Sequence, residues 1–132
     1  MEAKAILRNC PMPARKMRLV VDQIRGVNVD KALNILQYSQ RPLYAQYVSK
    51  LLRSGIANWA QINDGRRIEE SDLFVKTVMV DAGFSIKRLR TAPQGRGNRI
   101  SKRSNHITLI VDSRQDAGKT VSEESLTEDT NA

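Results

Sequence analysis

Cysteine occurs only once in the sequence, as Cys10, and histidine only once, as His106. A single cysteine excludes a disulfide within the chain, so a secreted scaffold held by disulfides is not expected. These residues are also too few for the Cys and His ligand sets of zinc sites, and we predict no metal and no cofactor. Nothing around Cys10 indicates a lowered thiol pKa, so we interpret it as an inert small residue.

Long apolar runs are also missing. None approaches the roughly 20 residues that a helix needs to cross a bilayer. The segment Met1 to Arg8 contains Glu2 and does not resemble a signal peptide. Aromatic residues make up only 5% of the chain, against 40% hydrophobic residues, so a mostly aliphatic core is predicted. We expect a soluble, cytoplasmic protein with no membrane association.

Acidic residues are scarce in the first 114 positions, which hold 21 basic and 9 acidic side chains. The formal net charge of the whole chain is +8, which favours a polyanionic partner. Residues 114–132 are instead acidic and rich in Ser and Thr, and we expect a disordered tail there. Residues 1–113 are predicted to form a single domain.

Three segments show the spacing of apolar residues that places them on one helix face. The first runs from Pro13 to Arg25, with the proline in its first turn and Gly26 just after its end. A second, shorter helix is predicted to follow Asn28 as its N-cap. The third and longest begins near Pro42 and ends around residues 63–65, with an apolar stripe of Ala45, Val48, Leu52, Gly55, Trp59 and Ile62. A glycine within a helix is unfavourable, so we expect another backbone to pass close to Gly55.

Two β-branched, apolar runs, Leu73 to Asp81 and Ile107 to Val111, predict strands. A third strand is predicted over Ala3 to Leu7, and residues 65–72 form a polar connection. The pattern predicts an α+β fold in which three helices pack on a small antiparallel sheet.

No acidic residue lies between Asp81 and Asp112, and this window holds Lys87, Arg88, Arg90, Arg96, Arg99, Lys102 and Arg103. Such a run is often only a solvated face or a tail, but strands bracket this one, and residues 91–98 have the Pro and Gly content of a turn. We predict a protruding basic β-hairpin over about residues 82–106, projecting roughly 35 Å. An isolated ribbon is marginally stable in water, so we expect phosphate groups to surround it.

A second basic surface is predicted on the first helix together with Arg8, and we expect it to bind the same partner as the hairpin; its residues are Arg8, Arg15, Lys16, Arg18 and Arg25. His106 begins a strand and is interpreted as a structural or RNA-contacting group rather than a general base. The carboxylates of Glu69, Glu70 and Asp72 resemble solvated turn residues. We therefore predict that the chain is not an enzyme.

Three stretches resemble the family of bacterial-type large-subunit ribosomal protein twenty-two. Residues 14–26 are similar to the family's first helix and its closing glycine, and residues 32–36 to its second helix. In the hairpin, Ile86-Lys87-Arg88, Gly95-Arg96 and residues 102–108 stand in the family's order and spacing. The resemblance extends from about Ala3 to Asp112.

The resemblance implies a structural rRNA-binding protein, monomeric within the ribosome, with its body near the mouth of the exit tunnel. Its hairpin would thread through rRNA, supporting subunit assembly, and would meet ribosomal protein four at a constriction. The implied rRNA contacts are Lys87, Arg88, Arg96, Arg99, Lys102, Arg103 and His106. The implied tunnel-side tip, past which the nascent peptide moves, comprises Arg90, Thr91, Ala92, Pro93, Gln94, Gly95, Arg96 and Gly97. The tip departs from the family at Ala92, where arginine is frequent, and at Arg90, where an apolar residue is frequent.

Two other functions fit parts of the pattern. An architectural DNA-binding protein would use the hairpin as a β-ribbon arm and wedge Pro93 between base steps. Such proteins usually act as dimers, and no dimer interface is evident in the sequence. A protein that binds acidic or membrane surfaces would need a strongly apolar face opposite the charge, and the hairpin has only scattered apolar residues.

Overall fold

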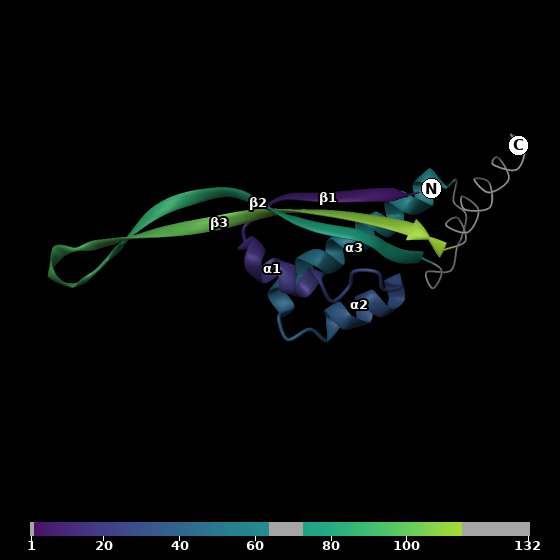
Figure 1. The fold of residues 1–132 in the computed structure, drawn as a ribbon, viewed down its shortest axis with the longest axis horizontal. Coiled ribbons are helices and arrows are strands. Elements are labelled where there is room, and N and C mark those ends of the chain that lie inside the picture. The colour runs from purple at the N-terminus through teal and green to yellow at the C-terminus, as the bar shows by residue number, and fades with distance from the viewer. Residues whose placement is uncertain (1, 64–72, 115–132) are drawn as a thin grey trace, which may run out of the picture.

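The computed structural model describes residues 2–63 and 73–114. In chain order the elements are β1 (Ala3–Cys10), α1 (Ala14–Val21), α2 (Val29–Gln37), α3 (Pro42–Ile62), β2 (Leu73–Thr91), the 3-10 turn η2 (Pro93–Gly95) and β3 (Gly97–Ser113). The strands form one antiparallel sheet in the order β1-β3-β2, and β2 and β3 leave the body as a long hairpin (Figure 1). The predicted α+β class is confirmed. The predicted connection at 65–72 and the tail after residue 114 lie outside the described residues.

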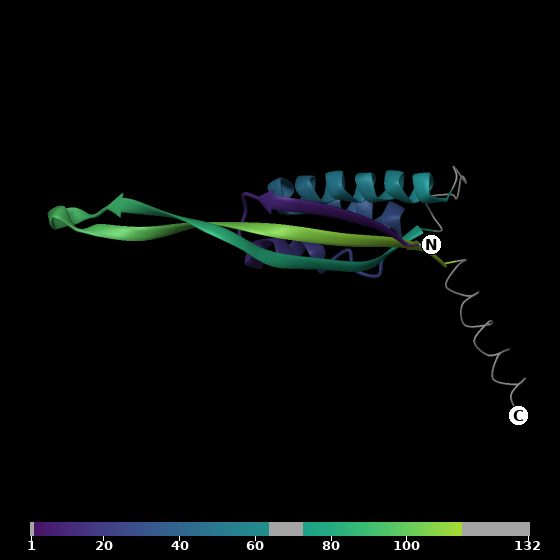
Figure 2. The same ribbon diagram turned by 90° about the horizontal axis from the view of Figure 1, so that it is seen from above.

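One face of the sheet is buried against the helices. Inward residues alternate with outward ones along each strand, as in a half-buried antiparallel sheet; they include Ala3, Ala5, Val75, Val78, Ile107, Leu109 and Val111. Helix α3 runs along the sheet on one side (Figure 2). The core is aliphatic, as the composition predicted, and Trp59 is the one buried aromatic residue among those described. Burying each Leu, Ile or Val side chain contributes about 1.5–3 kcal/mol.

Helix α3 presents the predicted apolar stripe to the sheet, with Val48, Leu52 and Trp59 buried. Two expectations for this helix were wrong. Ile62, its last residue, is 48% exposed and lies outside the core. At Gly55 the close neighbours are side chains rather than a backbone: an added Cβ would lie 3.1 Å from Leu109 Cδ2 and 3.3 Å from Val111 Cγ2. The glycine therefore lets the helix approach the branched side chains of β3 closely.

Helices α1 and α2 lie where the periodicity predicted them, with small differences at their ends. Helix α1 ends at Val21, earlier than predicted, although Ile24 in the turns after it is still fully buried. Pro13 is the N-cap residue rather than part of the first turn. Gly26 adopts φ +75°, as its predicted position after the helix requires. Helix α2 begins directly after Asn28, as predicted.

Candidate nucleic-acid interface

The hairpin continues the sheet far beyond the body. Strands β2 and β3 stay paired from Leu73↔Ser113 to Thr91↔Gly97. Nearly every residue from Ala82 to Arg103 is exposed, and none of them is buried. Since no other element covers this part of the ribbon (Figure 1), its two faces and both edges are open to a partner.

The register of the hairpin separates its positive charges. Every basic residue of the paired arms lies opposite a neutral one, in the pairs Ser85↔Arg103, Ile86↔Lys102, Lys87↔Ser101, Arg88↔Ile100, Leu89↔Arg99 and Arg90↔Asn98. This avoids like charges directly opposite each other, which destabilise a ribbon. Because side chains alternate between faces, one face carries Lys87, Arg99 and Arg103 and the other carries Arg88, Arg90 and Lys102. A partner that neutralises all six must contact both faces.

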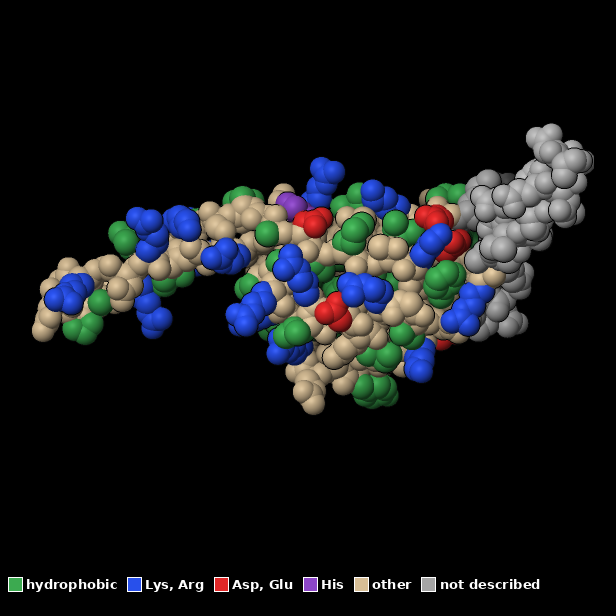
Figure 3. All heavy atoms as spheres, viewed as in Figure 1, with side chains coloured by type: hydrophobic (Ala, Val, Ile, Leu, Met, Phe, Trp, Pro, Cys, Tyr) green, Lys and Arg blue, Asp and Glu red, His purple; other side chains and the backbone are tan. Residues whose placement is uncertain are grey.

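The carboxylates in the described part of the chain do not neutralise these cations. Within the described ranges, no ion pair involves a basic residue of the hairpin; the ion pairs there are Arg25–Asp22 and Lys76 with Glu2 and Asp112. The Lys87 ammonium donates to Ser101 Oγ at 2.8 Å, a neutral partner. Figure 3 shows Lys and Arg side chains along the arm, whereas Asp and Glu side chains lie on the body. Among residues 2–63 and 73–114, the positive charge of the hairpin is therefore not compensated by an ion pair.

The tip is a tight turn, as its Pro and Gly content predicted. The Ala92 N–H donates to the Arg96 carbonyl at 2.8 Å and closes the loop. Gln94 and Gly95 both adopt left-handed conformations, with φ 64° and 70°. Residues from Arg90 to Gly97 are exposed except for Ala92, which is half-buried. The structure thus brings all the predicted tip residues together at the end of the ribbon.

Three residues of β3 hold the hairpin at its root, the place where the two arms leave the body. The Ser104 hydroxyl donates to the Phe84 carbonyl at 2.8 Å, and the Asn105 amide donates to the Met12 carbonyl at 2.7 Å. His106 Nδ1 accepts the Asn9 N–H at 3.0 Å, which ties β3 to β1. An acceptor Nδ1 places the proton of a neutral imidazole on Nε2. His106 therefore has the structural role that was one of its two predicted interpretations.

The root is also where the register shifts on both sides of β3. β1 has an irregularity between Leu7 and Cys10, and β2 has one between Ala82 and Ser85. At Gly83, in the second shift, an added Cβ would lie 2.4 Å from Ser104 Oγ. Bulges bend and twist a strand, so this pair of shifts sets the direction in which the arm leaves the body.

The predicted basic face of the first helix divides into two groups. The Arg18 guanidinium donates twice to the Val80 carbonyl, at 3.2 and 3.1 Å, and Arg25 donates to the Val78 carbonyl at 3.1 Å. Both therefore cap the outer edge of β2. Arg8, Arg15 and Lys16 are exposed and have no ion pair or side-chain hydrogen bond within residues 2–63 and 73–114. Sequence periodicity cannot distinguish these two groups.

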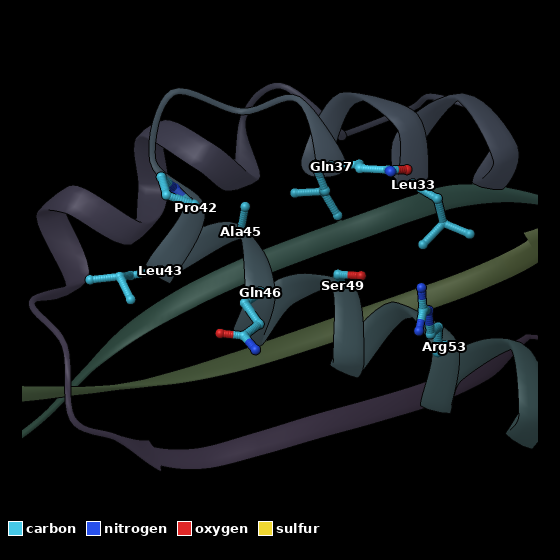
Figure 4. A pocket seen from close by; sticks show the side chains of 9 residues that line it. Leu33, Gln37, Pro42, Leu43, Ala45, Gln46, Ser49 and Arg53 are labelled. Atoms are coloured by element: carbon cyan, nitrogen blue, oxygen red, sulfur yellow. The ribbon is translucent and has the colours of Figure 1, made fainter.

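Metal-ligand groups, cavities and reactive thiols are the features of the described part of the chain that bear on catalysis. No three His, Cys, Asp or Glu side chains gather there in a group that could hold a metal ion. A cavity of about 470 Å³ between α2 and α3 is lined by one charged residue, Arg53, with Gln37, Gln46 and apolar neighbours (Figure 4). Burial raises the pKa of the Cys10 thiol, which disfavours the reactive thiolate.

None of the helices in the described ranges has the length and apolar character to cross a membrane.

Residues 5–112 match the ribosomal protein L22p/L17e family. The chain belongs to this family. It is similar to the large ribosomal subunit protein uL22 of Bacteroides fragilis, at 56% identity over 110 residues, which cover 83% of this chain and 79% of the relative. The protein of the same name from Porphyromonas gingivalis is 55% identical over 108 residues, 82% of this chain and 79% of the relative. That of Flavobacterium psychrophilum is 52% identical over 111 residues, 84% and 80% of the two chains.

Membership of the L22p/L17e family confirms the resemblance found in the first helix and in the hairpin. The match contains both arms of the hairpin and ends at Asp112, which is also where the resemblance described above ends. It also confirms that the chain is a ribosomal protein of the translation machinery, located in the ribosome of the bacterial cytoplasm.

Proposed function

We propose that this L22p/L17e protein is a non-enzymatic rRNA-binding component of the large ribosomal subunit, bound through its hairpin. The observation that carries the proposal is the distribution of six cations over both faces of an exposed ribbon that has no acidic residue. Duplex or folded RNA carries phosphates on many sides, so a ribbon threaded between RNA segments meets phosphate on both faces. Each contact releases a counterion, which supplies affinity independent of sequence.

The positions that we assign to the body and the hairpin tip within the large subunit follow from membership of the L22p/L17e family. The body lies at the surface of the subunit near the tunnel mouth, and the tip from Arg90 to Gly97 lines the peptide exit tunnel. There it contacts the nascent peptide and ribosomal protein four, and the hairpin supports subunit assembly and tunnel architecture. The closed turn of the tip and the exposed side chains of Arg90 and Arg96 support this placement, in which backbone and arginine side chains form part of the tunnel wall.

The phosphate contacts fall on three sets of residues. The hairpin supplies the six cations of its paired arms, with Arg96 at the tip. The body adds Arg8, Arg15 and Lys16, whose charged groups are exposed. Arg18 and Arg25 contact phosphates through the guanidinium N–H groups that do not bond to β2. His106 contacts phosphate through its Nε2–H.

Salt-dependent binding tests the proposal. The full chain is titrated against large-subunit rRNA and against duplex DNA of matched length at several salt concentrations. The seven hairpin cations alone should contribute roughly −5 to −6 to the slope of the logarithm of affinity against the logarithm of salt concentration, and the body cations should make the slope steeper. Arg99→Gln and Lys102→Gln should each reduce that slope by about one, while Lys31→Gln on α2 serves as a matched control and leaves it unchanged.

The comparison with DNA decides between the proposal and its main rival. Clearly tighter binding to the rRNA is expected at every salt concentration. Equal affinity for rRNA and duplex DNA would instead favour an architectural DNA-binding protein and would overturn the proposal.

A further inference from the structure

A cavity of about 370 Å³ lies at the root of the hairpin, where the arm meets the body. It is lined by Asn9, Pro11, Pro13, Phe84, Ile86, Ser101, Lys102, Arg103 and Ser104, which come from β1, the turn after it and both arms. The register shifts in β1 and β2 lie beside it and open the space between arm and body. The volume is near the lower end of the range for small-molecule sites, roughly 300–1,000 Å³. A duplex is far too large for it, whereas a single base fits.

Phe84 gives this cavity an aromatic wall that packing does not explain. Phe84 is 60% exposed and is not part of the core cluster. The Ser104 hydroxyl fixes its backbone through the Phe84 carbonyl, so the ring is attached to a defined strand. Exposed aromatic rings beside cations are the arrangement on which unpaired bases stack in proteins that bind single-stranded nucleic acid.

The lining of the cavity also includes charged and hydrogen-bonding groups. Lys102 and Arg103 line it, and among the described residues neither has a carboxylate partner. Asn9 adopts φ 55°, a conformation uncommon outside glycine, and its backbone N–H is held by His106 Nδ1. The Asn9 side-chain amide makes no hydrogen bond within the described ranges. An amide offers one acceptor and two donors, which suit the edge of a nucleobase.

We propose that this cavity binds one unpaired nucleobase of the rRNA. The base stacks on Phe84, its edge meets the Asn9 amide, and the neighbouring phosphates contact Lys102 and Arg103. The proposal rests on the proposed function and deepens it, because it assigns base recognition to one place on a surface that otherwise contacts phosphates. The ligand is a nucleotide rather than an acidic peptide because the lining combines an aromatic ring for stacking with an amide for a base edge and two cations for phosphates.

Substitutions at Phe84 separate stacking from apolar bulk. Phe84→Leu keeps an apolar side chain without a ring and should weaken binding of the full chain to large-subunit rRNA between roughly 5- and 150-fold. Phe84→Trp keeps a ring and should remain within about twofold of the parent chain, since stacking accepts any aromatic group. The salt slope should not change in either variant, because no phosphate contact is lost. Tyr38→Leu, at a position 83% exposed after α2, is the matched control and should bind like the parent chain.

Chemical probing of the rRNA supplies a second readout at nucleotide resolution. The parent chain and Phe84→Trp should protect one unpaired nucleotide that becomes reactive again in Phe84→Leu, while other protections persist. Thermal unfolding checks that all variants are folded. Full affinity and an unchanged protection pattern in Phe84→Leu would overturn the nucleobase site and leave the proposed function standing. Failure of the parent chain to prefer rRNA over duplex DNA would instead overturn the proposed function itself.

Discussion

Replacing Gly83 with alanine should destabilise the protein at the root of its hairpin. The added Cβ would lie 2.4 Å from Ser104 Oγ and 3.3 Å from both His106 Nε2 and the Ser104 carbonyl carbon. Rotation of the Ser104 hydroxyl would relieve the 2.4 Å contact only by breaking its hydrogen bond to the Phe84 carbonyl, and the two contacts at 3.3 Å would remain. Overpacking costs about 1–3 kcal/mol, and losing the Ser104 hydrogen bond to Phe84 adds about 0.5–1.5 kcal/mol. We expect the free energy of unfolding to fall by about 1.5–4.5 kcal/mol.

Urea unfolding followed by tryptophan fluorescence measures this effect, because Trp59 is the only tryptophan and is buried in the core. Gly97→Ala provides the control. It makes the same change in the same hairpin, but the nearest atom to its added Cβ is Leu89 Cδ2 at 3.8 Å, an ordinary contact. It should shift the unfolding free energy by less than about 0.5 kcal/mol. Equal shifts for the two variants would refute the argument that close approach of β3 requires glycine at position 83.

Three further predictions concern the rest of the molecule. Arg18→Met removes two donors to the Val80 carbonyl and should lower the unfolding free energy by about 1–2 kcal/mol. Lys16→Met, on the same helix, should leave the urea midpoint unchanged and reduce the salt dependence of rRNA binding instead. Replacing residues 88–98 with a short turn should preserve the cooperative thermal transition, because none of them is buried; loss of that transition would contradict a projecting arm. The buried Cys10 thiol, whose pKa is raised, should resist a thiol reagent at pH 8 and react only after urea unfolding; rapid reaction in the native protein would contradict this.

The sequence predicted the elements because their signals are local. Apolar spacing located the helices, and β-branched runs located the strands. The acid-free window between Asp81 and Asp112, with Pro93 and Gly95 near its middle, predicted the hairpin and its turn. Even the left-handed residue after the first helix followed from Gly26 alone, since helix termination depends on neighbours in the chain.

What escaped prediction depends on contacts between distant segments. The register shifts near Asn9 and Gly83 exist only relative to β3, so strand propensity does not reveal them. Phe84, to which we assign base stacking, was not singled out from the sequence because its exposure depends on where the ribbon leaves the body; an aromatic residue next to a glycine was the available signal. Arg18 and Arg25 resemble solvent-facing cations in the sequence, and only the position of β2 shows the carbonyls to which they donate.

The closed outer edge of β2 has a consequence for newly made protein. Along the body, the Gly26 N–H and the Val27 carbonyl pair with Val75, and the two arginines occupy the carbonyls further along the strand. An open edge invites strand addition by another chain and hence aggregation. On the arm, where nothing covers the edge, repulsion between like-charged copies opposes the same addition. In a copy released before its RNA is available, the β2 edge is thus protected from strand addition without the help of a partner.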